Sequence, residues 1–349
     1  MHDGLRSTAP SGGRAVQRVA IVGGGIGGLA LAAALDPRRF AVTIYEAEPA
    51  RARLGGGLVL WPSTMRALER LGGAKPLRDN GIEVRGGIHT LQGAFVRSAP
   101  DLGLLMVARP VLLAALQAAV PSSVRVEEST IHDPRTLDAD VVVGADGVRS
   151  VVRGLIEPGR AQRLPTPYVA LRGPVHDAVA ADEEGEYWGP GALFGVVGAG
   201  GREGYWFTTH RSALQEPLAV PDVVGEFRRH LGRAGAPVID RVLASAGRET
   251  TATRMWTTPA LRRYVRGRYV VIGDAAHAMT PNLGRGACDA ILDATSLADA
   301  LAAENLTRWQ ARRVPVTQAA RITAGLVMRT ALLDRGHAAR DRLMRGLPG

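Results

Sequence analysis

A glycine-rich turn near the N-terminus constrains the fold of this chain more than any other feature. Residues 18–22 form an apolar run typical of a buried strand, and residues 29–35 are rich in alanine and leucine, which favour a helix. Between them stand Gly23, Gly25 and Gly28, in the GxGxxG spacing that lets a backbone approach a pyrophosphate at a helix N-terminus. The segment therefore predicts a strand, a phosphate-binding turn and a helix.

An acidic residue strengthens this interpretation. A second apolar run over 40–45 ends at Glu46, which completes a βαβ unit. A carboxylate at this strand end accepts hydrogen bonds from ribose hydroxyls and disfavours a 2′-phosphate. A purely structural turn would not explain the acid, so we expect this unit to bind a dinucleotide other than NADP.

Two later segments repeat the pattern of a buried strand followed by a polar loop. Residues 140–144 lead into Asp146, and residues 268–272 lead into Asp274. A carboxylate at a strand end can accept hydrogen bonds from the polyol of a cofactor tail. Beyond Asp274, Gly284 and Gly286 precede a helix expected over 287–303, where free N–H groups can face an electron-rich ring.

The middle of the chain has a different texture. From residue 165 to about 259 the sequence is β-rich, and residues 194–197 and 204–209 flank a glycine-rich turn that predicts a hairpin. The segment 305–347 looks helical. We expect an α/β fold with a Rossmann-like cofactor-binding domain, an inserted antiparallel β-sheet and C-terminal helices. The expected divisions are a disordered tail over 1–17, a discontinuous cofactor domain over 18–75, 104–164 and 260–349, and a substrate domain over 76–103 and 165–259.

In this order the three motifs resemble those of the class A FAD-dependent monooxygenases, the p-hydroxybenzoate hydroxylase-like aromatic hydroxylases. The resemblance covers residues 18–348 and implies FAD as the cofactor, with NADPH or NADH as a transient co-substrate. It also implies that O₂ reacts through a C4a-hydroperoxyflavin that hydroxylates or epoxidises a small aromatic or unsaturated molecule, in specialised metabolism. The residues that the resemblance places around FAD are Gly23, Gly25, Ile26, Gly27, Gly28, Glu46, Ala47, Gly56, Gly57, Arg109, Asp146, Gly147, Asp274, Pro281, Gly284, Gly286 and Ala287.

The substrate side follows partly from strand alternation. Tyr205, Phe207 and Thr209 fall on one face of the expected hairpin, and Trp206, Thr208 and His210 on the other. The first set matches the substrate-facing positions of the family better. We take Tyr205 and Pro281 as candidates for a catalytic role, and the candidate substrate contacts are Trp61, Arg172, Leu193, Tyr205, Phe207 and His210.

The chain also departs from the family pattern. The segment 124–140 is short, so the local cover of the cofactor differs, and Gly198 stands where many relatives have proline. Two alternatives stay open: an FAD-bound relative that catalyses cyclisation or Baeyer–Villiger-type insertion, and a non-catalytic flavin-binding protein. Flavin halogenases share the fold, but the WxWxIP motif is absent from the sequence.

Composition narrows the function classes further. The net charge is +10 with Lys75 as the only lysine, and the arginines are scattered rather than clustered, which disfavours nucleic-acid binding. No apolar stretch approaches the ~20 residues that span a membrane. Cys288 is the only cysteine, so cysteine-based metal clusters are not expected. We expect a cytoplasmic monomer or homodimer without a metal.

Overall fold

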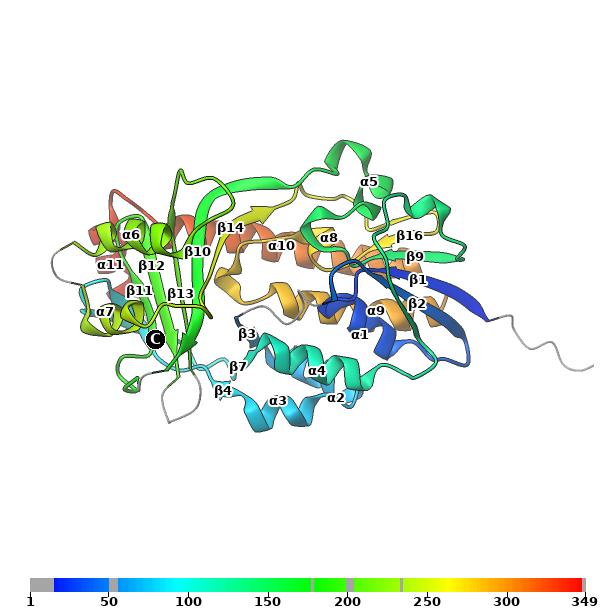
Figure 1. Cartoon of the computed structure of the whole chain (residues 1–349), viewed down its shortest axis with the longest axis horizontal. Helices are drawn as coiled ribbons and strands as arrows, with labels where there is room; N and C mark the ends of the chain where they lie inside the picture. Colours follow the sequence, from blue (N-terminus) through cyan, green and yellow to red (C-terminus); the bar gives the residue numbers. More distant parts are fainter. Residues whose placement is uncertain (1–15, 50–55, 177–178, 199–203, 233–234, 347–349) are drawn as a thin grey trace, which may run out of the picture.

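The computed structural model describes residues 16–49, 56–176, 179–198, 204–232 and 235–346. The tail expected over 1–17 falls mostly outside these ranges. Its end is already structured, because strand β1 (Gln17–Val22) begins inside it and pairs with β2 (Phe40–Glu46) from Gln17 onward. The boundary of the tail at residue 17 was therefore wrong. Figure 1 shows two large sheets toward opposite ends of the long axis, with helix α10 (Leu306–Ala331) running between them.

The first sheet carries the three sequence motifs. Its order is β15-β16-β9-β1-β2-β8, and β16, β9, β1, β2 and β8 are parallel. Helices α1 (Ile26–Ala34) and α9 (Gly286–Ala302) contribute to the same hydrophobic core as the strands of this sheet. The remaining strands are β8 (Arg125–Glu128), β9 (Val141–Gly144), β15 (Val265–Arg266) and β16 (Tyr269–Val271). The predicted Rossmann-like architecture is confirmed, and the short segment 124–140 supplies edge strand β8.

The second sheet is antiparallel except where β11 and β5 pair in parallel. Its order is β14-β10-β13-β12-β11-β5-β6. Its strands are β5 (Gly87–Thr90), β6 (Phe95–Ser98), β10 (Leu164–Val175), β11 (Gly185–Trp188), β12 (Ala192–Val197), β13 (Gly204–Arg211) and β14 (Thr251–Thr257). The predicted hairpin is present, since β12 and β13 pair antiparallel.

Two helices within the β-rich segment were not anticipated. Helices α6 (Val220–Leu231) and α7 (Pro237–Ala244) cover one face of the second sheet. In α6 the buried residues are Val223, Phe227 and Leu231, a spacing of four that gives one apolar helix face. This period is easily overlooked among neighbouring strands.

Smaller elements join the two sheets. A three-stranded sheet is formed by β3 (Gly57–Leu60), β7 (Leu105–Ala108) and β4 (Ile82–Glu83), next to helices α2 (Pro62–Arg70), α3 (Ala74–Asn80) and α4 (Arg109–Ala119). The other helices are α5 (Val152–Ile156), α8 (Asp274–His277) and α11 (His337–Arg345), with short 3₁₀ turns at Pro134–Thr136, Gly147–Arg149, Pro158–Arg160 and Pro281–Leu283. None of the helices in the described ranges is long and apolar enough to cross a membrane.

Candidate active site

The glycine turn is shaped both for tight packing and for an open approach. Gly23 has φ +103°, and a Cβ there would overlap the carbonyl oxygen of Ala145. A Cβ on Gly28 would overlap the carbonyl oxygen of Gly23. By contrast, a Cβ on Gly25 would meet no atom within 4 Å. Two glycines therefore bring α1 close to the sheet, while Gly25 faces free space at the helix N-terminus, where a phosphate group fits.

The acid at the end of β2 is held in place by the same turn. Glu46 Oε2 accepts a hydrogen bond from the Gly24 N–H at 2.6 Å, and Oε1 accepts one from Glu48 N–H at 2.8 Å. Ala47 follows as an exposed residue. Ile26 and Gly27 are buried in the first turn of α1, so they shape the turn through packing. Glu46 is thus fixed beside the phosphate-binding turn, as a ribose-binding acid should be.

The other two motifs end at the same edge of the sheet because β1, β9 and β16 are parallel neighbours. Asp146 Oδ2 accepts a hydrogen bond from Val151 N–H at 2.8 Å, whereas its buried Oδ1 has no hydrogen-bond partner in the described structure. Burial raises the pKa of Asp146. Gly147 has φ +70°, and a Cβ there would meet nothing within 4 Å. This motif therefore also presents an open surface.

Buried Arg153 joins the Asp146 motif to the Asp274 motif. Its guanidinium donates to the carbonyl oxygens of Ala275 at 2.9 Å and Ala276 at 3.1 Å, and also to those of Pro259 and Arg160. Burial lowers its pKa to about 10. This side chain satisfies backbone carbonyls next to the cofactor edge and fixes the two motifs relative to each other.

Asp274 is the acid best placed to bind an absent ligand. Its side chain reaches solvent, yet no hydrogen bond from a described residue reaches its carboxylate. The surrounding protein atoms raise its pKa, while the charges of His277 and Arg109 oppose that shift. A Cβ placed on Gly286 would lie 4.0 Å from Asp274 Oδ1, so the N-terminus of α9 begins beside this carboxylate. This edge of the sheet therefore offers an acceptor for hydroxyl groups next to a stretch of backbone at Gly286 that carries no side chain.

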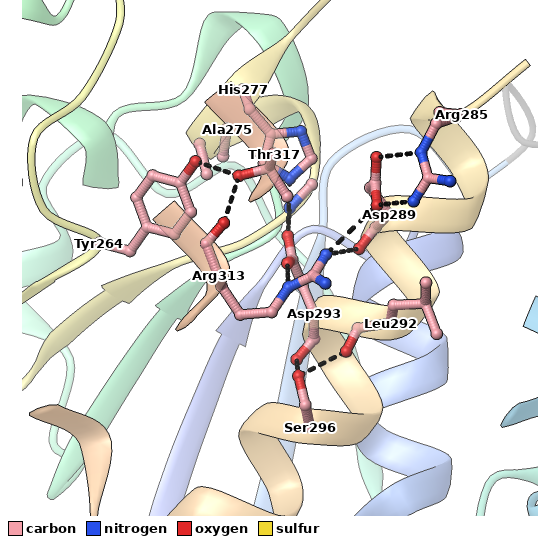
Figure 2. A network of polar contacts seen from close by, with 12 residues as sticks. Tyr264, Ala275, His277, Arg285, Asp289, Leu292, Asp293, Ser296, Arg313 and Thr317 are labelled. Carbon is pink, nitrogen blue, oxygen red and sulfur yellow. Dashed lines mark hydrogen bonds and ion pairs between the residues drawn. The ribbon is translucent and has the colours of Figure 1, made fainter. Parts of the chain in front are cut away.

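A buried ionic network supports the Asp274 loop from behind (Figure 2). Asp293 Oδ2 accepts hydrogen bonds from Gly273 N–H at 3.0 Å and from His277 Nε2 at 2.7 Å. Arg313 Nε donates to Asp293 Oδ1 at 2.7 Å. Burial lowers the pKa of His277, but the Asp293 charge outweighs burial and the net pKa is raised. The network thus fixes the backbone at Gly273, one residue before Asp274.

Asp289 connects this network, through Arg285, to Trp61 and the loop that follows Pro281. Its carboxylate receives Arg285 Nη2 at 2.9 Å and Arg313 Nη2 at 3.3 Å. The Arg285 guanidinium also lies 5.3 Å from the centre of the Trp61 ring. Trp61 Nε1 donates to the carbonyl oxygen of Leu283 at 3.1 Å. Trp61 is therefore attached to the loop between Pro281 and Gly286.

The Pro281 loop and the Gly56 segment form the next part of the site. Pro281 is exposed, Gly284 has φ +59° and packs on Val59, and Ala287 lies in the first turn of α9. The N–H of Arg109 donates to the carbonyl oxygen of Gly56 at 3.1 Å. The residues that the sequence placed along the flavin edge are thus joined through β3.

Tyr205 connects this edge to the second sheet. A Cβ on Gly56 would overlap the Tyr205 hydroxyl, and a Cβ on Gly57 would lie 2.7 Å from Tyr205 Cδ1. The buried hydroxyl has no hydrogen-bond partner of acceptable geometry among the described residues, and burial raises the pKa of Tyr205 to about 12. Both glycines are needed for this ring to lie against β3.

Of the other candidate substrate contacts, two share the Tyr205 face and are accessible. Phe207 lies two residues further along β13, and Arg172 of β10 is its register partner. Leu193 is also on this face but is 2% exposed and packs against Met328 of α10, so it belongs to the core.

The expected substrate contact at His210 is contradicted. His210 lies on the opposite face, where its Nε2 is 3.2 Å from Glu226 Oε2 of α6. The sheet separates it from Tyr205, because alternate residues of a strand point to opposite faces.

Sequence reasoning missed the network around Asp293 as a functional support and missed Glu186 of β11 on the Tyr205 face. A buried acid inside an apolar helix was the available signal for Asp293. No local signal marks Glu186, because its position depends on strand register.

The single cysteine lies in the environment of a structural residue. Cys288 is buried, burial raises the pKa of its thiol, and the thiol donates to the carbonyl oxygen of Val59 at 3.2 Å.

Comparisons with known proteins agree with this geometry. The FAD binding domain family matches residues 107–313, and the NAD(P)-binding Rossmann-like domain matches residues 21–58. The aurachin C monooxygenase/isomerase of Stigmatella aurantiaca is 33% identical over 326 residues, covering 85% of each chain. The 3-amino-4-hydroxybenzoate 2-monooxygenase of Streptomyces cremeus is 31% identical, covering 86% of this chain and 84% of its own.

Solved structures support the fold. Klebsiella pneumoniae HpxO complexed with FAD and uric acid superposes with a TM-score of 0.83 at 20% identity, covering 95% of this chain and 94% of its own. The open glycine turn, the free acceptor at Asp274 and the bare N-terminus of α9 fit FAD. Sequence, site geometry and relatives together show that the chain belongs to the class A FAD-dependent monooxygenases.

Proposed function

We propose that this enzyme hydroxylates or epoxidises a small, electron-rich aromatic or unsaturated molecule in specialised metabolism, with NADPH or NADH as the electron donor. The observation that carries the proposal is the contact of Tyr205 with Gly56 and Gly57, since it joins the aromatic face of the second sheet to the cofactor edge. Relatives named for aurachin C, 3-amino-4-hydroxybenzoate and 2-heptyl-3-hydroxy-4(1H)-quinolone support a ring substrate.

The residues of the cofactor edge would hold FAD in parts. Gly25 and the first turn of α1 would face the pyrophosphate, Glu46 the adenosine ribose, and Asp274 the ribityl or pyrophosphate part. The backbone from Gly284 to Ala287 and the Gly56–Gly57 segment would lie along the ring system. When bound and reduced by NAD(P)H, FAD supplies the activation of O₂ and the transfer of one oxygen atom.

On the substrate side the protein would position the substrate and exclude water from the reacting atoms. Tyr205 and Phe207 offer apolar rings against which an aromatic substrate can stack. Pro281 and Trp61 would close the opposite side of the ring. Exclusion of water matters because solvent diverts activated oxygen to hydrogen peroxide, and an aromatic lining serves that purpose. Arg172 offers a cation for an anionic or carbonyl group of the substrate.

The decisive experiment starts from the purified full chain. We expect yellow protein with stoichiometric FAD, and oxidation of NADPH or NADH that accelerates when an aromatic substrate is added. Mass spectrometry should find a product heavier by one oxygen atom. Colourless protein that takes up no FAD would refute the proposal, and bound FAD without stimulation by any compound of a broad aromatic panel would favour a flavin-binding protein without catalysis.

One relative favours a second candidate, oxygenation followed by rearrangement. It is named a monooxygenase/isomerase and matches 85% of this chain. The mass of the product would be the same, so the carbon skeleton determined by NMR separates the two outcomes. Baeyer–Villiger-type insertion or cyclisation would be detected by the same analysis.

The remaining expectations are part of the proposal. We place the enzyme in the cytoplasm, where NAD(P)H is available, as a monomer or homodimer that binds no nucleic acid. Native mass measurement and cell fractionation test these points. The division into a cofactor domain and a substrate domain, with the boundaries given above, is likewise proposed; limited proteolysis of the FAD-loaded protein tests it.

A further inference from the structure

Strand register brings one acidic residue into line with two substrate-side residues. Glu186 of β11 is the partner of Gly195 of β12, Gly195 is the partner of Phe207 of β13, and Phe207 is the partner of Arg172 of β10. Register partners share a face of the sheet, so these four residues form one row. We call this the Glu186–Arg172 row.

The Phe207 ring spans the middle of this row. A Cβ on Gly195 would overlap the ring, so Phe207 lies over the glycine and reaches toward the strand of Glu186. Tyr205, two residues away on the same strand and face, contacts Gly56 and Gly57. The row therefore lies beside the proposed cofactor edge. The Phe207 ring makes its middle apolar, and the side chains of Glu186 and Arg172 make its two ends polar.

Glu186 has few hydrogen-bond or ion-pair partners for an acid that the protein largely encloses. Its Oε2 accepts a hydrogen bond from Trp188 Nε1 at 2.7 Å. Within the described structure no arginine, lysine or histidine forms an ion pair with it. Its register neighbour on the other side is Ile88. Burial raises its pKa, and the hydrogen bond from Trp188 opposes that effect by favouring the charged acceptor form.

Arg172 stands at the other end with its own charge uncompensated. Its guanidinium forms no ion pair with the acids of the described ranges. Burial raises the pKa of Tyr205, and the charge of Arg172 opposes that shift. Three strand spacings of about 4.8 Å separate the backbones of Glu186 and Arg172. Less the lengths of the two side chains, that span matches one small fused ring system.

We propose that Glu186 binds the substrate by accepting a hydrogen bond from a ring N–H or hydroxyl, while Arg172 binds an oxygen acceptor at the opposite end of the same ring. The inference rests on the proposed function and specifies its substrate class. That class is an aromatic compound polarised along its length, with a donor at one end and a carbonyl, phenolate or carboxylate at the other. Polar groups with unused hydrogen-bonding capacity beside an apolar ring discriminate strongly, because a wrong ligand leaves that capacity unsatisfied.

The test uses FAD-loaded protein and two ring compounds, 4(1H)-quinolone and 1-methyl-4-quinolone, in which an N–CH₃ group replaces the ring N–H donor; the variants of Glu186 separate loss of the donor from the added bulk of the methyl group. Dissociation constants are measured by titration of the flavin absorbance spectrum. We expect wild-type protein to bind 4(1H)-quinolone about tenfold more tightly, in line with one charge-assisted hydrogen bond. Glu186→Leu should abolish that preference, and Glu186→Gln, which keeps an acceptor, should retain part of it.

Controls separate this effect from general damage. Glu249→Gln replaces an exposed glutamate outside the row and should leave both dissociation constants unchanged. All variants should keep the wild-type ratio of FAD to protein. Equal affinity of wild type for both quinolones, no binding of 4(1H)-quinolone, or an unchanged preference in Glu186→Leu would overturn the inference. The proposed function fails separately, if the FAD-loaded wild type consumes no extra NAD(P)H with any compound of the aromatic panel.

Discussion

The network behind the cofactor edge and the substrate face differ in how many partners their charged side chains have. Behind the cofactor edge, Asp293 is fully enclosed and bound by Arg313, His277 and the Gly273 amide. On the substrate face, Glu186 accepts one hydrogen bond and Arg172 has no ion pair within the described ranges. The Asp293 network pairs its charges without a ligand, whereas the substrate face, like Asp274 at the cofactor edge itself, leaves polar groups that a ligand can pair. From this contrast we expect the buried network to fix the backbone of the site before a ligand binds, and selectivity for the substrate to reside in the groups without a partner.

The largest expected effect tests whether the buried network supports the fold. Asp293→Ala should lower the free energy of unfolding by about 3–5 kcal/mol, since His277 then loses its charge partner and Arg313 keeps only its longer contact with Asp289 at 3.3 Å. Urea unfolding measures it. Asp299→Ala on the same helix removes an exposed carboxylate 3.9 Å from Arg70 and should cost about 0.5 kcal/mol or less. A loss for Asp293→Ala no larger than that of Asp299→Ala would mean that the network is not a support.

Next in size is the loss of a free acceptor at the cofactor edge. Asp274→Ala should weaken FAD binding by about 10- to 100-fold, because charge-assisted hydrogen bonds to FAD hydroxyls are removed. The unfolding free energy of the FAD-free protein should change little, since no described residue hydrogen-bonds this carboxylate. Flavin fluorescence titration gives the affinity. Unchanged affinity would remove Asp274 from the FAD site.

The glycine turn offers a test of the open approach. Gly25→Ala adds a methyl group into space that no protein atom occupies, so it should spare the folded protein and weaken FAD by about tenfold. Gly23→Ala is the matched contrast, because it should destabilise the protein through its φ of +103° and its overlap with Ala145. Equal FAD affinity in wild type and Gly25→Ala would show that the pyrophosphate lies elsewhere.

On the substrate face the effect should fall on coupling rather than on the cofactor. Tyr205→Ala should retain FAD, while the share of NAD(P)H that ends in product falls by about half because water gains access. Hydrogen peroxide and product are measured together. Loss of FAD from this variant would place Tyr205 in the cofactor site instead.

The smallest effect is a pH dependence of stability. The pKa of His277 is raised above 6.5, so its protonated form stabilises the fold fully below pH 6.5 and loses that contribution as pH rises through the raised value. Above pH 6.5, the unfolding free energy of wild type should fall more steeply with pH than that of His277→Gln. Parallel pH profiles of the two proteins would mean that His277 is neutral in the fold.

Prediction of the local structure from sequence succeeded where the residues concerned are neighbours in the chain. Each cofactor-edge motif combines the end of a strand with the loop that follows it, and the local sequence pattern identifies the strand and the loop together. This applies to the turn from Gly23 to Gly28, Glu46 and the Asp146 and Asp274 motifs. The start of α9 is likewise marked by a local pattern, glycines before a helix. Helices α6 and α7 escaped because their apolar spacing stands among alternating strands. His210 was wrong as a substrate contact because it lies on the face opposite Tyr205, as strand alternation already indicated, and α6 covers that face.

The sequence by itself determined the cofactor half of this protein, since a short strand, a glycine turn and an acid specify a phosphate-binding edge within about 30 residues. On the substrate side the sequence named Tyr205, Phe207 and Arg172 as candidates, but only the tertiary structure decided which side chains share a row and added Glu186 to them. Glu186, Phe207 and Arg172 come from three separate strands, and a slip of one residue in any register would turn that strand's side chain to the opposite face. Local chemistry can be identified along the chain, whereas a row of side chains across a sheet exists only once the strands have paired.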